Sequence, residues 1–342
     1  MKTIRLGKTE LVVSSTGFGA LPIQRTEMEE AVRILRAAFE GGITFFDTAN
    51  AYTDSEKKIG EALSDVRDRI VIATKTAAKD ADTARAHVEN SLKMLRTDRI
   101  DIVQLHNMKK MPDPEDPQSP YYALAELKAQ GVIEHVGCTS HSLEIATAAA
   151  KSGLFETIQF PFSYISTDED IALADLCREL DLGFIAMKGL AGGMLTDAAL
   201  CYAFVREHPN VVPIWGIQRM EELKQWLGFE ENPPVMTDEM RAKREADKKE
   251  YAGEFCRACG YCLPCSVGIN IPTAGRMKTL LRRSPWQTFV NPEFYKEMHK
   301  IDDCIDCGLC MSRCPYGLNT PEMLRIMLKD YDEFYAAHMN KA

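Results

Sequence analysis

Hydrophobic and polar positions alternate with two different periods along the first two thirds of the chain. From about residue 28 to 228, segments with apolar residues at helical spacing follow short runs of β-branched and aromatic residues. One helical segment ends on Gly41-Gly42, and the largely apolar run 43–49 follows it directly. Nearly continuous apolar strands, each followed by a helix, are typical of a parallel sheet that helices cover.

The number of predicted strands favours a closed barrel. Counting the short run near Phe18 as the first strand gives eight, the number that closes a TIM barrel. An open doubly wound sheet would carry G-x-G-x-x-G after its first strand, and the sequence has no such motif there. We therefore expect an α/β fold, a (β/α)8 TIM barrel. Its N-terminal hairpin, over residues 4–13, should turn at Gly7-Lys8 and close the bottom of the barrel.

The composition changes after the last predicted barrel helix. Residues 236–251 are highly charged at helical spacing, which indicates a solvated connecting helix. A length of 342 residues agrees with about two domains. We expect the barrel to span residues 1–230 and a charged helical linker to span 231–255. A small, mainly α-helical ferredoxin-like domain should then occupy residues 256–342.

Eight of the 11 cysteines fall in two short runs within this last part. The first run is C-R-A-C-G-Y-C-L-P-C, and the second is C-I-D-C-G-L-C-M-S-R-C-P. The second reproduces the bacterial ferredoxin spacing C-x2-C-x2-C-x3-C-P, whose fourth cysteine binds the other cluster of a pair. We therefore expect two [4Fe-4S] clusters. Their predicted ligands are Cys256, Cys259, Cys262, Cys265, Cys304, Cys307, Cys310 and Cys314.

The ferredoxin spacing also suggests how the two runs share their cysteines. An exchange would place Cys314 with the first three cysteines of the first run, and Cys265 with the first three of the second. The first run departs from the pattern, because two residues instead of three separate Cys262 from Cys265, and Ser266 stands where proline is usual. The sequence therefore leaves the cluster of each distal cysteine open.

Zinc and disulfides are the alternatives for so many cysteines. Paired C-x2-C knuckles also form zinc sites, but zinc needs only two pairs and leaves half of each run without a role. Disulfides belong to oxidising compartments, whereas the chain starts at Met1 without a signal peptide and has no apolar stretch near 18 residues. We expect a cytoplasmic protein. Three cysteines outside the runs should be buried as small hydrophobic residues: Cys138, Cys177 and Cys201.

The formal net charge of -9 limits the partners of the chain. A negative protein repels nucleic acids and anionic membrane surfaces, so we expect neither as a partner. A basic redox partner protein would be attracted.

Four polar residues stand at or near the ends of consecutive predicted strands. Asp47 ends I-T-F-F-D, Tyr52 follows five residues later, Lys75 ends I-V-I-A-T-K and His106 ends D-I-V-Q-L-H. The C-terminal strand ends of a TIM barrel carry its active site, so these side chains are expected to converge above the barrel. Singly, each has an ordinary explanation as a helix cap, a solvated side chain or a buried histidine.

Together with the motif D-T-A-x-x-Y, the four residues resemble the catalytic tetrad of the aldo-keto reductase family over residues 1–228. The resemblance implies carbonyl reduction with Tyr52 as general acid, Lys75 as the cation beside it, Asp47 as the partner of that lysine and His106 as the donor to the carbonyl oxygen. A free tyrosine with a pKa of about 10 is a slow donor at neutral pH, and a nearby ammonium favours its ionised form.

The same resemblance implies a nicotinamide cofactor across the mouth of the barrel. His141 replaces the usual asparagine beside the carboxamide, and Met187 replaces an aromatic residue that often stacks on the ring. NADP(H) over NAD(H) is the family default, and in place of the usual basic pair Arg219 is the only local candidate for a 2'-phosphate contact. The matched cofactor-binding positions are Ser140, Gln159, Lys188, Gly216, Gln218 and Glu222.

Clusters carry one electron at a time, whereas a nicotinamide exchanges two as hydride. The clusters are therefore structural or sense oxidants, or a flavin occupies the nicotinamide position, or an external flavoprotein mediates. We expect an oxidoreductase that reduces a small-molecule carbonyl, or oxidises an alcohol, with electrons linked to the clusters. The alternatives are a nucleotide-binding redox sensor and an electron-transfer subunit with little turnover.

Overall fold

The computed structural model describes residues 1–251, 255–258, 260–283, 286–314 and 316–339. The chain divides into two compact units. The first, here called the barrel unit, comprises residues 1–190 and 197–245, and the second, the cysteine-rich unit, comprises residues 191–196 and the chain from 246 onward.

Eight parallel strands of the barrel unit form a closed barrel, in the order β10-β3-β4-β5-β6-β7-β8-β9. This confirms the predicted TIM barrel, including a first strand at Phe18. The strands are β3 (Gly17–Gly19), β4 (Phe45–Asp47), β5 (Val71–Thr76), β6 (Ile100–Leu105), β7 (Ile133–Thr139), β8 (Thr157–Pro161), β9 (Gly183–Met187) and β10 (Val211–Gly216).

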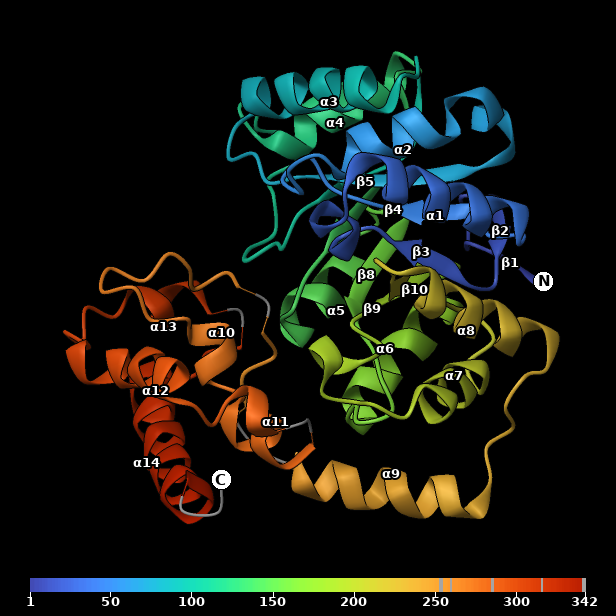
Figure 1. The fold of residues 1–342 in the computed structure, drawn as a ribbon. Helices are drawn as coiled ribbons and strands as arrows, with labels where there is room; N and C mark the ends of the chain where they lie inside the picture. Colours follow the sequence, from blue (N-terminus) through green and yellow to red (C-terminus); the bar gives the residue numbers. More distant parts are fainter. Residues whose placement is uncertain (252–254, 259, 284–285, 315, 340–342) are drawn as a thin grey trace. The chain divides into compact units, whose positions relative to one another are not determined.

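Helices follow the strands and surround the barrel (Figure 1). Several begin at a Ser, Thr or Asp whose side-chain oxygen accepts a backbone N–H of the first turn, as Asp80, Ser119 and Thr167 do. The helices are α1 (Met28–Glu40), α2 (Ser55–Leu63), α3 (Ala81–Leu95), α4 (Pro120–Ala129), α5 (Leu143–Lys151), α6 (Asp168–Glu179), α7 (Ala198–Arg206) and α8 (Met220–Glu231), with short 3-10 turns at Pro22–Arg25 and Ser64–Arg69. A further 3-10 turn, Ala191–Gly193, belongs to the cysteine-rich unit.

The predicted N-terminal hairpin is present. Strands β1 (Thr3–Arg5) and β2 (Val12–Ser14) pair antiparallel, and Leu6 and Val13 are fully buried against side chains of the barrel strands. Gly7 forms a β-bridge with Leu182, the residue just before β9. The hairpin therefore closes the end of the barrel at which the strands begin.

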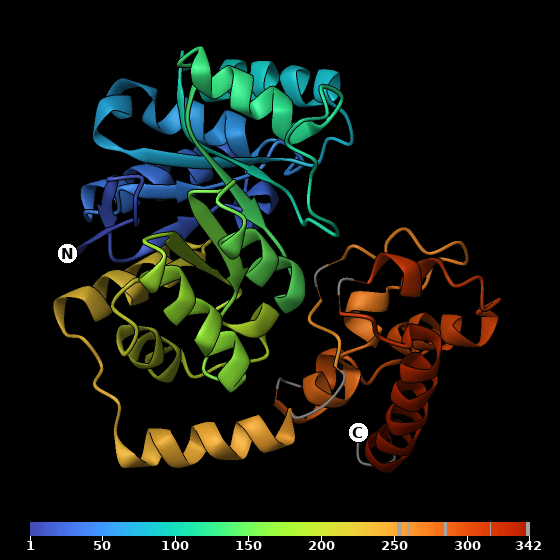
Figure 2. The ribbon, with the colours of Figure 1, turned by 180° about the vertical axis from the view of Figure 1, so that it is seen from behind.

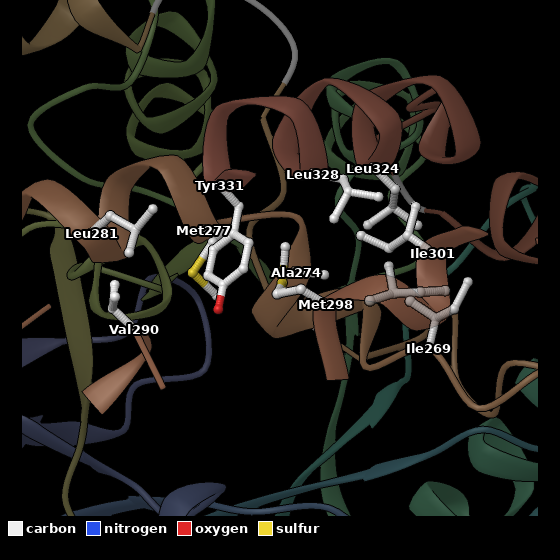
Figure 3. Packing of buried hydrophobic residues seen from close by; sticks show 11 residues of the cluster. Ile269, Ala274, Met277, Leu281, Val290, Met298, Ile301, Leu324, Leu328 and Tyr331 are labelled. Atoms are coloured by element: carbon white, nitrogen blue, oxygen red, sulfur yellow. The ribbon is translucent and has the colours of Figure 1, made fainter. Parts of the chain in front are cut away.

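The cysteine-rich unit is helical, as expected, and no strand occurs among its described residues. Its buried apolar side chains form one core, in which Tyr331 of the last helix lies beside Met277 and Val290 (Figure 3). The elements are α10 (Ile271–Ala274), α11 (Met277–Arg283), α12 (Pro292–His299), α13 (Leu309–Arg313) and α14 (Thr320–Met339), with 3-10 turns at Trp286–Thr288 and Lys300–Asp303. Figure 2 shows α12 to α14 from behind.

A charged helix, α9 (Asp238–Glu250), lies within the stretch that the sequence marks as a linker. The division between the two units falls after residue 245, inside this helix. The domain boundaries at residues 230 and 256 stay predictions. Within the described part of the chain, every helix is too short or too polar to cross a lipid bilayer.

Gly7 gives a test of how tightly the hairpin is held. Its φ is +53°, and a Cβ there would lie 2.4 Å from the carbonyl oxygen of Asp181. Gly131 has a φ of +76° and open space around its Cβ position. We expect Gly131→Ala to lower the free energy of unfolding by about 1 kcal/mol through backbone strain alone. Gly7→Ala should cost clearly more in urea unfolding followed by circular dichroism. Equal losses would contradict the close packing at Gly7.

Candidate active site and cysteine sites

The centre of the candidate active site is an ion pair between neighbouring strands. Lys75 in β5 donates from Nζ to Oδ1 of Asp47, the last residue of β4, over 2.6 Å, and to the carbonyl oxygen of Thr48 over 2.5 Å. Lys75 and Asp47 are each only 2% exposed. Two charges that are so deeply buried depend on each other and on their hydrogen bonds, because water does not solvate them.

The rings of Tyr52 and His106 lie next to this pair. Nζ of Lys75 lies 5.3 Å from the centre of the Tyr52 ring, and the Tyr52 and His106 rings meet edge to face with centroids 5.7 Å apart. Tyr52 comes from the loop after β4, and His106 follows β6 directly. The structure thus brings the four predicted residues together at the C-terminal ends of three adjacent strands.

Burial governs the charges of these groups. It lowers the pKa of Lys75 and raises the pKa of Asp47, and their mutual attraction opposes both shifts. Burial also lowers the pKa of His106 to about 3, and the positive charge of Lys75 adds to this shift. His106 is therefore a neutral imidazole at physiological pH, with one ring nitrogen able to donate a hydrogen bond.

Two buried polar residues at this site do not appear in the sequence-based prediction. Gln104 in β6 donates from Nε2 to Oε1 of Gln159 over 2.8 Å and to Oδ2 of Asp47 over 3.4 Å. Glu56 in α2 is 4% exposed and accepts a 2.5 Å hydrogen bond from Oγ1 of Thr74. A signal existed for Gln104, because it is a polar residue inside the apolar strand two positions before the predicted histidine.

The residues matched to a nicotinamide site lie around the same barrel mouth. Ser140, after β7, donates from Oγ to the carbonyl oxygen of Met108 over 3.1 Å. Gln159, in β8, accepts from Gln104. Lys188 follows β9 with a φ of +60°, and Gly216 ends β10.

The matched residues near α8 form hydrogen bonds at the N-terminus of that helix. Oε2 of Glu222 accepts the backbone N–H of Gln218 over 2.9 Å, and Oε1 accepts Nε of Arg219 over 2.9 Å. Arg219, the candidate for a 2'-phosphate contact, is thus paired with a carboxylate of its own helix. This arrangement adds no support for NADP(H) over NAD(H).

The first cysteine site is a cavity of the cysteine-rich unit lined by Cys256, Cys262 and Cys314. Arg257 and Tyr316 also line it, and the guanidinium of Arg257 lies 4.2 Å from the centre of the Tyr316 ring. Cys259, the fourth expected ligand, lies outside the described residues.

The second cysteine site is a cavity lined by Cys265, Cys304, Cys307 and Cys310, with Cys262 at its border to the first. The backbone N–H of Leu309 and the hydroxyl of Ser266 lower the pKa of Cys307, which favours the thiolate that iron binds. The grouping of Cys314 with the first run and Cys265 with the second is the exchange that the ferredoxin spacing suggests.

The described cysteines at both sites form no disulfide. In a [4Fe-4S] cluster each cysteine binds a different iron, so the ligands surround a cavity, and the described cysteines of the two runs line two cavities.

Comparison with known proteins identifies both parts of the chain. The model of the aldo/keto reductase family matches residues 15–200, and the chain belongs to this family. The model of a 4Fe-4S dicluster domain matches residues 255–319. Both the resemblance to this family and the predicted ferredoxin-type tail are thereby confirmed.

Curated relatives match the barrel part. Aldo-keto reductase YhdN of Bacillus subtilis (strain 168) is 30% identical over 207 residues, which are 56% of this chain and 60% of that protein. L-galactose dehydrogenase of Arabidopsis thaliana is 32% identical over 211 residues, 56% of this chain and 66% of that protein. The chain thus spans less than two thirds of the length of these relatives.

Solved structures agree with the fold. Aldo-keto reductase AKR11C1 from Bacillus halodurans, in its holo form, has a TM-score of 0.63 at 25% identity, covering 72% of this chain and 96% of that one. An aldo/keto reductase from Klebsiella pneumoniae in complex with NADP and acetate has a TM-score of 0.59 at 26% identity, covering 72% and 95%.

The low pKa of His106 gives a prediction for titration. The native state should not bind a proton at this ring between pH 8 and pH 5, whereas the unfolded state binds one below about pH 6.5. This residue therefore makes the free energy of unfolding fall as the pH decreases from about 6.5 toward 3. NMR of the imidazole carbons, with His106→Gln to assign the signal, should show no titration above pH 5. A midpoint near pH 6.5 would contradict the burial.

Proposed function

We propose that this protein is an oxidoreductase that reduces a small-molecule carbonyl, or oxidises the corresponding alcohol, at the mouth of the barrel. One observation carries the proposal: the buried ion pair of Lys75 and Asp47 lies beside the ring of Tyr52, and the neutral ring of His106 meets the same tyrosine. A buried cation next to a phenol is an arrangement that supports proton donation by tyrosine.

The four residues divide the work of carbonyl reduction. A reduced nicotinamide, when bound, supplies a hydride to the carbonyl carbon, so a proton must reach the carbonyl oxygen as negative charge develops. The hydroxyl of Tyr52 donates this proton, and the ammonium of Lys75 stabilises the phenolate that results. The ring N–H of His106 donates a hydrogen bond to the same oxygen, and Asp47 holds Lys75 in place.

NADP(H) is the proposed nicotinamide. Support comes from the Klebsiella pneumoniae relatives of known structure, which are complexes with NADP and with NADPH. The proposed cofactor contacts are Ser140, Gln159, Lys188, Gly216, Gln218 and Glu222.

The C-terminal unit, in this proposal, holds two [4Fe-4S] clusters that supply one-electron transfer when bound. The two cavities favour one ligand set of Cys256, Cys259, Cys262 and Cys314 and another of Cys265, Cys304, Cys307 and Cys310. An external flavoprotein or another redox partner protein would connect one-electron and two-electron chemistry. Thiolate ligands of this kind persist in a reducing compartment, which supports a cytoplasmic protein.

Replacing the proposed proton donor tests the reaction. Tyr52→Phe should lower kcat for carbonyl reduction by about 100-fold to 10,000-fold, because a positioned general acid contributes that much. Dissociation constants for NADPH should stay near those of the unmodified protein. Tyr121→Phe is the matched control, since that hydroxyl only donates to the carbonyl oxygen of Leu154. Near-normal turnover of Tyr52→Phe would refute the assignment, and strong NADPH binding without any turnover in the unmodified protein would favour a sensor.

Metal analysis tests the clusters separately. Protein purified without oxygen should contain about eight iron and about eight acid-labile sulfide per chain, as two cubane clusters require, and little zinc. Cys307→Ser should lose about half of the iron, whereas Cys138→Ser, at a buried cysteine of the barrel, should lose none. Stoichiometric zinc with no sulfide would contradict the cluster assignment.

A further inference from the structure

The two cysteine cavities differ in the charged groups around them. Arg257 lines the first cavity and stacks on the rings of Phe255 and Tyr316. Residues lining the second cavity, within the described part of the chain, are cysteine, apolar residues, glycine and one serine, without a charged side chain. Two clusters held in these cavities would therefore experience different electrostatic potentials.

A second arginine lies beside the first cavity. A Cβ on Gly275 would lie 2.9 Å from Cβ of Cys256, so the backbone at this point packs directly against that ligand. The next residue, Arg276, is half-buried and donates to carbonyl oxygens, from Nε to Pro272 over 3.1 Å and from Nη1 to Gly192 over 2.7 Å. Burial lowers the pKa of Arg276, and the negative charge of Cys256 opposes that shift.

No carboxylate neutralises Arg276 within the described residues, since its hydrogen-bond partners there are carbonyl oxygens. By contrast, the arginines near the second cavity are exposed. Arg325 pairs with Asp306, and both of these side chains are more than half exposed. Arg313 donates to the carbonyl oxygens of Leu263 and Pro264 over 3.4 Å from an exposed position. A half-buried cation without a carboxylate partner acts strongly on a nearby anionic centre, whereas water and salt largely screen an exposed cation.

We propose that Arg276, with Arg257, gives the cluster bound by Cys256, Cys262 and Cys314 the higher reduction potential of the two. Reduction adds one negative charge to a cluster, and nearby positive charge stabilises that added charge. Solvent acts in the opposite direction, because Cys307 at the second site is exposed while Cys256 is 8% exposed. We expect the half-buried Arg276 together with Arg257 to outweigh both the exposure of Cys307 and the exposed Arg313 at the second site, so that the charges decide the order.

The consequence is a direction for electrons within the cysteine-rich unit. An external one-electron donor, such as a reduced viologen or a reduced ferredoxin-type protein, is oxidised as it reduces the exposed cluster. That cluster then returns to its oxidised form as it reduces the cluster beside Arg276, and no proton is needed. A single electron would therefore reside mainly on the cluster held by Cys256, Cys262 and Cys314. This inference rests on the proposed pair of clusters.

The test is a redox titration of the full-length protein, purified without oxygen and followed by electron paramagnetic resonance. Arg276→Gln should lower one midpoint potential by about 59 mV, which is a tenfold change in a one-electron reduction equilibrium. The other midpoint potential should stay unchanged. Arg276→Lys should keep most of the original value, because it keeps the charge. Arg282→Gln is the control, since Arg282 in α11 pairs with Asp330 and lines neither cavity.

The outcomes separate this inference from the proposed function. The signal that Arg276→Gln shifts should be the one that Cys307→Ser leaves intact. Two clusters whose potentials do not respond to Arg276→Gln would overturn the inference while preserving the clusters. Equal shifts in Arg276→Gln and Arg276→Lys would also overturn it, since shape rather than charge would then be the cause. A protein without iron would instead refute the proposed function itself.

Discussion

The buried ion pair of Lys75 and Asp47 is the interaction on which the arrangement of the candidate active site depends. The register of the barrel fixes it, because Asp47 lies opposite Ala73 and Lys75 lies opposite Gln104. Removal of one partner from such a pair leaves an uncompensated charge and costs about 3–5 kcal/mol. The same low-dielectric setting keeps His106 neutral and places an ammonium beside a phenol, so one electrostatic constraint organises all four groups.

The cysteine-rich unit uses charge in a related way on a different scaffold. Its cysteines gather around two cavities above a core of apolar side chains that includes Met277, Leu281 and Tyr331. Short helices and turns are enough to position these cysteines, because ligands spaced three residues apart lie on one turning segment of backbone. The apolar core packs against that segment and keeps it in place. The half-buried Arg276 beside the first cavity, whose partners among the described residues are carbonyl oxygens, then distinguishes two sites that the cysteine spacing alone makes nearly equivalent.

Much of this organisation could be predicted from the sequence, for physical reasons. The strand count and the strand-end positions of Asp47, Lys75 and His106 follow from periodic burial, and the cysteine spacing follows from cluster geometry. Gln104 was missed because its role needs the other strands: its side chain donates to Gln159 of β8 and to Asp47 of β4. Arg276 was missed because its proximity to Cys256 arises only from packing.

The most direct test of this account is the activity of Asp47→Asn in the full-length protein. The substitution keeps the shape and one hydrogen-bond acceptor, but removes the charge that holds the ammonium of Lys75. The account predicts at least a roughly tenfold fall in kcat for carbonyl reduction, equivalent to about 1.4 kcal/mol of transition-state stabilisation, with NADPH binding largely preserved. An Asp47→Asn protein with unchanged kcat would show that the ion pair does not support the chemistry.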